Sequence, residues 1–150
     1  MTHHEAARLA LEFYEKAGII LTSAEKAGIE IADFGLGELE RTGLQIVTYI
    51  NTERVCAKEM VLFPGQTCPE HRHVTSYGQP GKEETFRCRY GQVLLHVEGR
   101  DIVLNPGEQY TIYPDTKHWF RGGPVGAVIS EFSTKSTDET DVFTDERIVR

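Results

Sequence analysis

The fold is decided by the stretch Pro64-Gly65-Gln66-Thr67-Cys68-Pro69-Glu70-His71-Arg72-His73. Side chains on a β-strand alternate between its two faces, so His71 and His73 point to the same side and can hold a metal ion there. Glu84 supplies a carboxylate further along the chain, and Gly91 marks a turn before the next apolar run. These residues predict neighbouring strands arranged around a metal.

A third imidazole follows the turn Asn105-Pro106-Gly107. The segment Gln109 to Tyr113 has the composition of a strand, and a second turn, Pro114 to Lys117, leads from it to His118. Three imidazoles and one carboxylate suit divalent manganese, iron, cobalt, nickel or zinc, and they leave coordination positions open for a substrate. We therefore expect the metal ligands to be His71, His73, Glu84 and His118.

Other candidate ligands fit the pattern less well. Glu83 precedes Glu84, but neighbouring strand residues face opposite sides, so only one of them reaches the metal, and the spacing to Gly91 favours Glu84. Cys68 is an alternative thiolate ligand, although its place between a turn and Pro69 favours a buried structural role. The remaining histidines are interpreted as ordinary core or surface residues: His3, His4 and His96.

The residue pattern of the rest of the chain changes once, near residue 44. From residue 44 onward, short apolar runs alternate with Gly, Pro, Asp and Asn about every ten residues, the rhythm of an all-β sandwich or barrel. We expect strands near residues 44–51, 55–63, 69–74, 84–89, 92–98, 101–104, 109–113, 117–120 and 125–133. The polar segment from Ser133 to Arg150 is expected to run over the surface, either as a frayed end or as a packed one.

Two helices are predicted before the strands. Apolar residues recur at roughly helical spacing from His4 to about Ile19, and Gly18 sits where a helix would stop. Thr22 with Glu25 has the form of a capping box that opens a second helix ending near Gly35 and Gly37.

Composition excludes several classes of protein. The chain has 150 residues, 39% of them hydrophobic, which is enough for one sizeable core. With 16 Lys and Arg against 23 Asp and Glu, the net charge of -7 disfavours nucleic acid and membrane surfaces as partners. The chain has neither a run of about twenty apolar residues nor a secretory signal, so we expect a soluble cytoplasmic protein. The three cysteines are expected to be reduced and buried.

The ligand segments resemble the two motifs of the cupin superfamily. In the first motif, Gly65, His71, His73, Glu84 and Gly91 stand at the family's spacing, except that the gap before the glutamate is longer than usual. In the second motif, Gly107 and His118 match, whereas Tyr113 and Asp115 replace the usual Pro and Gly. The long gap, residues 74–83, contains three Gly or Pro residues and is expected to form a loop at the mouth of a barrel.

This resemblance implies one all-β domain over residues 1–150, a single cupin with a jelly-roll-like β-barrel. Residues 1–37 would form a helical N-terminal arm, 44–133 the barrel and 134–150 a surface tail.

A more specific resemblance, to the D-lyxose isomerase family of bacterial cupins, covers nearly the whole chain. It is carried by Tyr14–Ile19, Asp33–Gly37, Lys58–His73, Lys82–Gly91, Gly107–Phe120, Thr137-Asp138 and Asp141–Ile148. It implies a manganese-dependent, homodimeric aldose–ketose isomerase that interconverts D-lyxose with D-xylulose and D-mannose with D-fructose. One departure is the tight connection from Val97 to Ile102, where relatives carry a longer excursion, so the substrate range is left open.

The residues are compatible with that reaction. An aldose–ketose isomerase must acidify the hydrogen at C2 of an open-chain sugar, and a metal assists by stabilising an enediolate. Glu131 shares a strand face with Ala127 and Ile129, so it is the first candidate for the base that moves the proton. Lys58, which alternates with Met60, is the second candidate, as a cation that steadies the sugar oxygens; the alternative is a surface lysine on an edge strand.

Two other classes of function remain open. A metal-dependent dioxygenase could use the same ligands, but it would prefer iron and a largely apolar pocket. A non-catalytic sugar-binding or regulatory cupin would keep the pocket without needing Glu131 and Lys58, although the chain has no basic patch that indicates a DNA-binding regulator.

Overall fold

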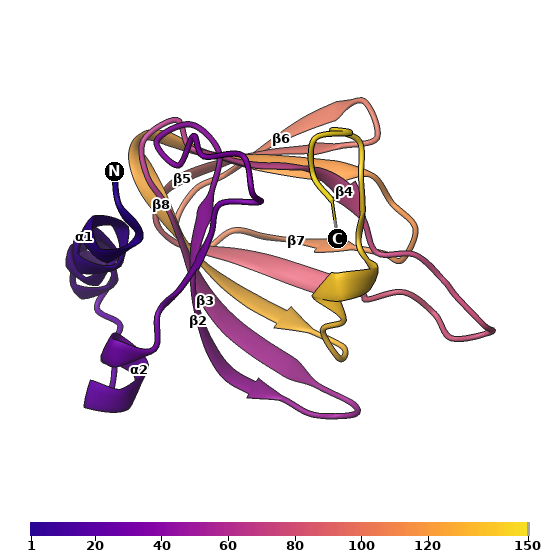
Figure 1. Ribbon diagram of the computed structural model, residues 1–150, viewed down its shortest axis with the longest axis horizontal. Coiled ribbons are helices and arrows are strands. Elements are labelled where there is room, and N and C mark those ends of the chain that lie inside the picture. Colours follow the sequence, from indigo (N-terminus) through magenta and orange to yellow (C-terminus); the bar gives the residue numbers. More distant parts are fainter. Residues whose placement is uncertain (150) are drawn as a thin grey trace.

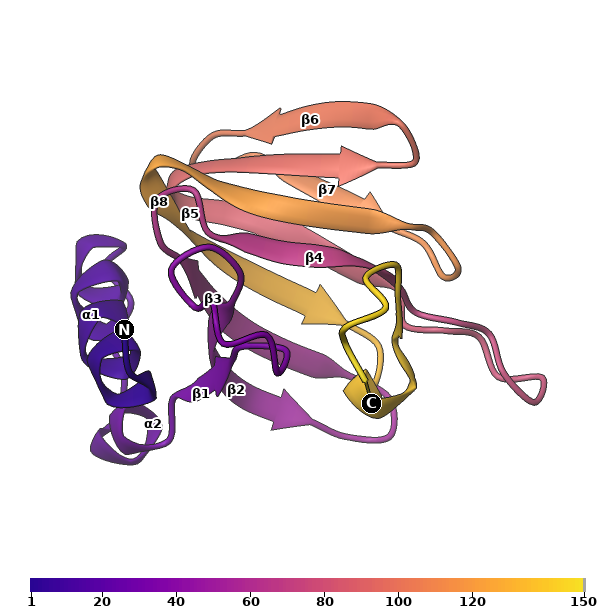
Figure 2. The same cartoon turned by 45° about the horizontal axis from the view of Figure 1, so that its top comes forward.

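The computed structural model describes residues 1–149, and Figures 1 and 2 show a strongly curled sheet with two helices on its outer side. The helices are α1 (His3–Lys16) and α2 (Ser23–Ala27), with a 3-10 turn η1 (Asp138–Thr140) near the C-terminus. The strands are β1 (Glu30–Ala32), β2 (Leu44–Asn51), β3 (Cys56–Leu62), β4 (Thr67–Arg72), β5 (Glu84–Val97), β6 (Arg100–Leu104), β7 (Gln109–Ile112), β8 (His118–Ser133) and β9 (Val142–Phe143). The all-β fold with a helical N-terminal segment, predicted from the sequence, is confirmed.

Strand β8 organises the sheet, because it pairs with β3, β4 and β5. Beyond β3 the sheet continues through β2 to β1, and beyond β4 it continues to β9. Strands β6 and β7 both pair with β5. The pairings between these strands are antiparallel, and Figure 2 shows that the curled sheet brings β2 and β3 round to face β4 and β5 across a common interior.

Strands β5 and β8 are each continuous where the sequence predicted two short strands. Both bend, and their pairing shifts register between Cys88 and Tyr90 and again between Gly91 and Val93. A Cβ atom on Gly91 would lie 2.0 Å from the carbonyl oxygen of Gly126. The two backbones can therefore approach closely only because residue 91 is a glycine, and the bend occurs inside a strand rather than at a break between strands.

The N-terminal helices begin as predicted, but the second ends early. Thr2 and Thr22 both form capping boxes, with Glu5 and Glu25 respectively. The second helix stops at Ala27, and the residues expected to continue it instead form β1, paired with β2. The expectation of a helix reaching Gly35 was therefore wrong, because edge pairing with β2 satisfies the backbone of this short segment.

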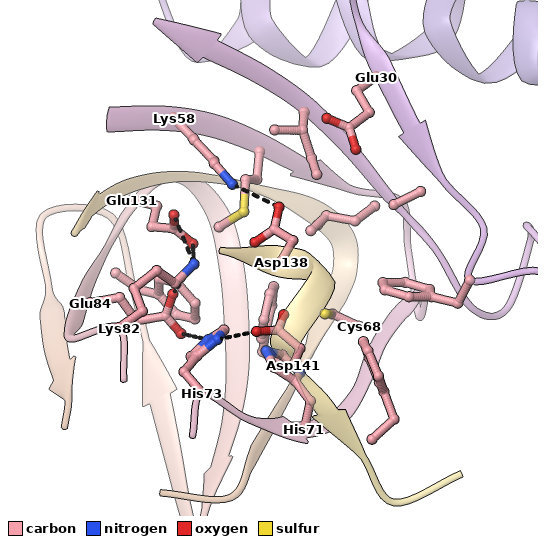
Figure 3. Close-up of a pocket in the computed structure, with 18 residues that line it drawn as sticks. Glu30, Lys58, Cys68, His71, His73, Lys82, Glu84, Glu131, Asp138 and Asp141 are labelled. Atoms are coloured by element: carbon pink, nitrogen blue, oxygen red, sulfur yellow. Dashed lines mark hydrogen bonds and ion pairs between the residues drawn. The ribbon is translucent and has the colours of Figure 1, made fainter. Parts of the chain in front are cut away.

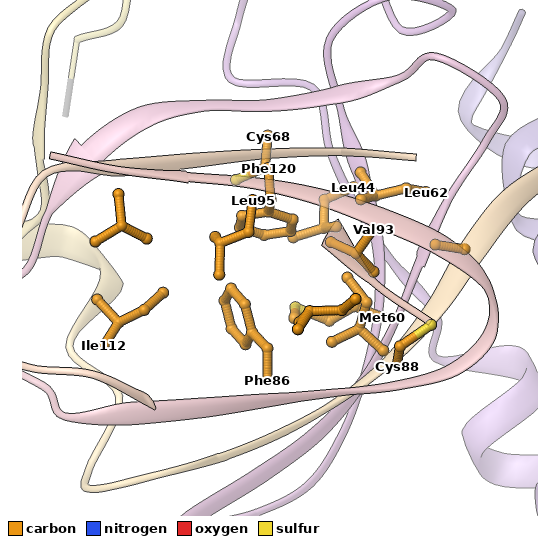
Figure 4. Packing of buried hydrophobic residues seen from close by; sticks show 14 of the residues in the cluster. Leu44, Met60, Leu62, Cys68, Phe86, Cys88, Val93, Leu95, Ile112 and Phe120 are labelled. Atoms are coloured by element: carbon orange, nitrogen blue, oxygen red, sulfur yellow. The ribbon is translucent and has the colours of Figure 1, made fainter. Parts of the chain in front are cut away.

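Apolar side chains fill the interior of the sheet (Figure 4). Met60, Phe86, Leu95 and Phe120 are among the most buried, and burying one such side chain contributes about 1.5–3 kcal/mol. A second cluster lies on the outer face, where α1 packs on residues of β2, β3 and β8. Tyr14 fixes the helix there by donating a hydrogen bond to the backbone oxygen of Glu59, at 2.9 Å.

The C-terminal segment packs across the open end of the curled sheet (Figures 1 and 2). Ser136 is buried, and its backbone nitrogen donates to the Asn51 side chain. Strand β9 pairs with β4, so that Phe143 lies opposite His71. Of the two alternatives for this segment, the structure therefore has the packed one over residues 136–143; residue 150 lies outside the described residues.

The predicted loop between β4 and β5 projects from the same end of the sheet (Figure 2). Ser76 and Gln79 bridge near its tip, and Tyr77 there is fully exposed. The base of the loop is tied by Thr75, whose hydroxyl donates to Asp115 at 2.6 Å. Within residues 1–149, none of the helices has the length and apolar composition needed to cross a membrane.

Candidate metal centre

The four predicted ligands meet at the open end of the interior. His71 lies in β4, His73 follows that strand, Glu84 begins β5 and His118 begins β8. All four are buried, and their ligand atoms lie within 4.8 Å of one another. The sequence pattern thus predicted a cluster that the fold assembles from three separate strands.

Strand pairing explains why these residues converge. His71 and His118 are direct partners between the antiparallel strands β4 and β8. His118 also faces Val97 of β5, on its other side. His73 is buried like His71, whereas the intervening Arg72 is only half-buried, so the alternation expected of a strand brings both histidines to the interior.

The imidazole rings are oriented so that their Nε2 atoms could bind a metal. The Nδ1 atoms of His71 and His118 lie 2.8 Å and 2.9 Å from backbone carbonyl oxygens, which can only accept. Nδ1 therefore carries the proton, and Nε2 is left with its lone pair. The Nε2 atoms of His73 and His118 lie 3.1 Å and 2.9 Å from one oxygen of Glu84.

The buried Nε2 of His118 makes no hydrogen bond to the described residues, although it lies close to Glu84. A buried ring nitrogen without a hydrogen bond is costly unless something else accepts its lone pair. Together with the three-imidazole, one-carboxylate donor set, this atom indicates that the cluster could bind a divalent metal.

Two members of the cluster are held in the protonation state that can bind a metal: His71 is neutral and Glu84 is negatively charged. Burial, and then the neighbouring His118 and His73, hold the pKa of His71 well below its usual range, so this ring is neutral at pH 7. Burial alone would raise the pKa of Glu84, but the Lys82 ammonium and the close ring nitrogens of His118 and His73 outweigh it and hold that pKa well below its usual range.

The pKa of His73 shifts in the opposite direction to that of His71, because His73 has two acidic partners. Burial lowers its pKa, but hydrogen bonds with Asp141 and Glu84 outweigh burial and raise the pKa to about 9. A metal at Nε2 would compete with the proton for the same lone pair, so binding would displace it.

A chain of buried charges leads from this cluster to Glu131 (Figure 3). The Lys82 ammonium lies 3.0 Å from Glu84 Oε2 and 3.4 Å from Glu131 Oε2. Burial raises the pKa of Glu131 to about 7; Lys82 lowers it and Glu84 raises it. Burial would lower the pKa of Lys82, but Glu84 and Glu131 outweigh burial and raise it, so the ammonium stays charged.

The structure places both predicted catalytic side chains at this pocket. Glu131 is 3% exposed and lines it, on the strand face predicted from the sequence. Lys58 is 7% exposed, so the alternative of a surface lysine was wrong. Its ammonium lies 3.0 Å from Ser136 Oγ and 3.3 Å from Asp138 Oδ2, away from the histidines.

Sequence reasoning missed Lys82 and the two acidic residues of the C-terminal segment. Lys82 stands two residues before Glu84 and, like it, is buried, whereas the intervening Glu83 is exposed. That alternation was available in the sequence, but Lys82 was assigned to the loop. Asp138 and Asp141 line the pocket although they come from the expected surface tail, and no local pattern signals that packing.

The rejected ligand candidates lie where the sequence predicted. Cys68 lines the pocket wall outside the ligand cluster, and burial holds its pKa well above the usual range. His96 bonds Asp101 and stacks on Trp119, while His3 and His4 are exposed.

The pocket has an apolar part and a charged part. Phe86, Met60 and Phe120 of the buried interior line its apolar part, and Glu30 and Asp138 stand further from the histidines (Figure 3). A small molecule with polar oxygens at several positions could therefore contact the ligand cluster at one end and charged side chains at the other.

Comparisons with known proteins agree with this picture. A profile of the cupin domain family matches residues 58–123. The chain is 57% identical to the D-lyxose/D-mannose isomerase of Thermosediminibacter oceani, with 93% of this chain and 88% of the relative covered. It is 54% identical to the D-lyxose ketol-isomerase of Cohnella laeviribosi, with 97% and 92% covered.

Two solved structures share the fold at low sequence identity. The L-ribose isomerase of Cellulomonas parahominis aligns with a TM-score of 0.80 at 16% identity, covering 97% of this chain and 92% of that one. The L-ribose isomerase of Acinetobacter sp., in complex with L-ribose, aligns with a TM-score of 0.80 at 15% identity, covering 96% and 91%. Because relatives more than half identical match along nearly its whole length, the chain belongs to the D-lyxose isomerase family of cupins.

Proposed function

We propose that this protein is a manganese-dependent aldose–ketose isomerase that interconverts D-lyxose with D-xylulose, and D-mannose with D-fructose. The observation that carries the proposal is the chain of contacts that joins the histidine cluster through Glu84 and Lys82 to Glu131. It combines a metal-binding set with a buried carboxylate, and a metal-assisted proton transfer uses both.

The metal would be held by His71, His73, Glu84 and His118. When bound, it would supply Lewis acidity to the oxygens at C1 and C2 of the open-chain sugar. Three imidazoles suit manganese and the later transition metals better than magnesium, which prefers oxygen ligands.

Glu131 is the base in this proposal. It removes the hydrogen from C2 of the aldose and returns it to C1, while a proton moves from the C2 oxygen to the C1 oxygen, so that atoms balance across an enediolate. Lys82 favours the charged form of Glu131 and balances negative charge on the reacting oxygens. Lys58, paired with Asp138, steadies sugar oxygens further from the reacting carbons.

The substrate assignment draws on the relatives' names and on the pocket. D-Mannose has the configuration of D-lyxose at C2, C3 and C4 and is longer by one carbon. A site that contacts the sugar at these three positions therefore binds both D-lyxose and D-mannose. Support for the hexose comes from the Thermosediminibacter oceani relative, whose name includes D-mannose.

The test is to strip the protein of metal with a chelator, reload it with Mn²⁺ and measure ketose formation from D-lyxose and D-mannose. We expect turnover of both sugars with about one metal per chain by elemental analysis. Sugar binding by calorimetry without turnover would instead support a non-catalytic cupin, and oxygen consumption would support a dioxygenase.

The cytoplasmic location and the homodimer expected from the sequence are part of the same proposal. Two exposed apolar side chains, Ile50 and Phe132, flank the half-buried Ala57 across neighbouring strands on the outer face of the sheet. Such a row supports an interface between copies of the chain. Sedimentation analysis should give a dimer, and a monomer would overturn this part.

A further inference from the structure

The three imidazoles of the cluster are held in two different ways. His71 and His118 each donate Nδ1–H to a backbone carbonyl two residues earlier, Pro69 and Thr116 respectively. The orientation of each ring is therefore fixed by the backbone of its own chain segment. His73 has no such local acceptor: its Nδ1 lies 2.7 Å from Oδ1 of Asp141, which is 68 residues away in sequence.

Asp141 belongs to the C-terminal strap, which we define as residues 134–144. The strap is anchored to the barrel at separate places: Ser136 bonds Asn51, Asp138 pairs with Lys58, and Thr144 bonds both the backbone and the side chain of Glu70. Asp141 lies between these anchors with its side chain 8% exposed, and Figure 3 shows it directed at His73.

The carboxylate of Asp141 is not a fifth ligand in this arrangement. It contacts the Nδ1 side of the ring, whereas Nε2, on the opposite side, faces Glu84 at 3.1 Å. The ring thus stands between Asp141 and the cluster. Because a carboxylate can only accept, Nδ1 must carry a proton, and it keeps that proton if a metal displaces the one on Nε2. A carboxylate that holds a metal-binding histidine in this way fixes the ring and strengthens its ligand nitrogen.

We infer that Asp141 is a positioning residue for the metal centre, which fixes His73 and so couples metal binding to the docking of the C-terminal strap. The inference rests on the metal site proposed above. Coupling of this kind is reciprocal: if the docked strap favours the metal, the bound metal must favour the docked strap by the same free energy.

The first test compares Mn²⁺ affinity among variants by calorimetric titration of the metal-stripped protein. Asp141→Ala should weaken binding about 10- to 100-fold. Asp141→Asn should fall between that variant and the wild type, because its amide oxygen still accepts from Nδ1 but carries no charge. Glu139→Gln is the matched control: Glu139 is exposed on the same strap, and its loss should leave affinity within about twofold.

A second control separates positioning from a purely structural role. Thr144→Val removes the hydroxyl that bonds Glu70 and loosens the strap without touching His73. If Asp141 merely tied the strap down, Thr144→Val would weaken Mn²⁺ binding as much as Asp141→Ala does. The other anchors of the strap remain in Thr144→Val, so Asp141 stays docked on His73, and we expect the Mn²⁺ affinity to stay within about threefold of the wild type.

The second readout is hydrogen exchange of the amides of Val142, Phe143 and Thr144 with and without Mn²⁺. The metal should slow their exchange in the wild type and in Glu139→Gln, and it should do so far less in Asp141→Ala.

Wild-type Mn²⁺ affinity in Asp141→Ala or Asp141→Asn would overturn the inference and leave the metal site standing. A wild-type protein that bound no Mn²⁺ would overturn the metal site itself. If Asp141→Ala does not fold, Asp141→Asn decides.

Discussion

The ammonium of Lys82 lies 3.4 Å from the carboxylate of Glu131, and both side chains are buried. A base for proton transfer from carbon must be shielded from water and yet carry its charge. Burial raises the pKa of Glu131 to about 7, and Lys82 limits the rise. The pair therefore satisfies both requirements, and each partner depends on the other.

Lys82→Met should lower turnover by about 100-fold or more, because it removes the cation that stabilises Glu131 and the reacting oxygens. Mn²⁺ binding should not weaken, since the substitution removes a positive charge 3.0 Å from a ligand carboxylate. Steady-state kinetics and calorimetry measure the two effects. Lys135→Met, at a solvent-exposed pair with Glu53, is the control and should retain activity. Turnover of Lys82→Met within about threefold of the wild type would remove Lys82 from the mechanism.

Lys58→Met should keep the metal and lose turnover to a smaller extent. The lysine contacts Ser136 and Asp138 rather than the ligand cluster, so metal content should be normal by elemental analysis. Loss of one charge-assisted hydrogen bond to a sugar oxygen corresponds to about 1.5–3 kcal/mol, or roughly 10- to 100-fold in kcat/KM. Unchanged kinetics would mean that Lys58 only anchors the strap.

Replacing any one ligand with alanine (His71, His73, Glu84 or His118) should lower both bound metal and activity. His96→Ala is the control, since His96 lies outside the cluster and pairs with Asp101. After chelation, Mn²⁺ should restore activity better than Mg²⁺, because imidazoles suit transition metals. Full occupancy in two ligand variants, or equal rescue by Mg²⁺, would show that the assignment is wrong.

The sequence predicts site residues whose position depends on neighbours in the same strand, but not those whose position depends on segments far away in the chain. Spacing within strands located His71, His73 and Glu131, because a period of two fixes which face each side chain occupies. The same rule would have located Lys82 had the strand been extended backwards from Glu84. Asp141 could not be found in this way, since its contact with His73 depends on how a distant, pattern-free segment packs across the barrel.

Gly91→Ala should destabilise the fold far more than Gly99→Ala. Both glycines have positive φ, so alanine at either costs about 1–2 kcal/mol in backbone strain. A Cβ at residue 99 would meet nothing within 4 Å, whereas at residue 91 it would lie 2.0 Å from the Gly126 carbonyl oxygen. We expect an additional loss of at least about 2 kcal/mol in Gly91→Ala from urea unfolding. Equal stability of the two variants would mean that the close approach of β5 and β8 does not constrain the bend.

Glu131→Gln should abolish isomerisation while leaving metal and sugar binding intact. The amide has nearly the shape of the carboxylate but cannot take a proton, so turnover should fall about 10²- to 10⁴-fold. Glu131→Ala is a poorer test, because it would also open a cavity against the buried interior. Calorimetry with Mn²⁺ and D-lyxose checks binding, and ketose formation checks chemistry.

The route of the hydrogen can be examined separately in heavy water. Proton transfer through Glu131 passes through a state whose proton can exchange with solvent, so deuterium at C1 of the ketose product, or at C2 of the aldose formed in the reverse direction, supports it. A shielded base can return the original proton, and a hydride shift also leaves the product unlabelled, so absence of label does not discriminate. The variant decides instead: Glu131→Gln with normal metal content and substantial turnover would exclude Glu131 as the base and favour a hydride shift or another base.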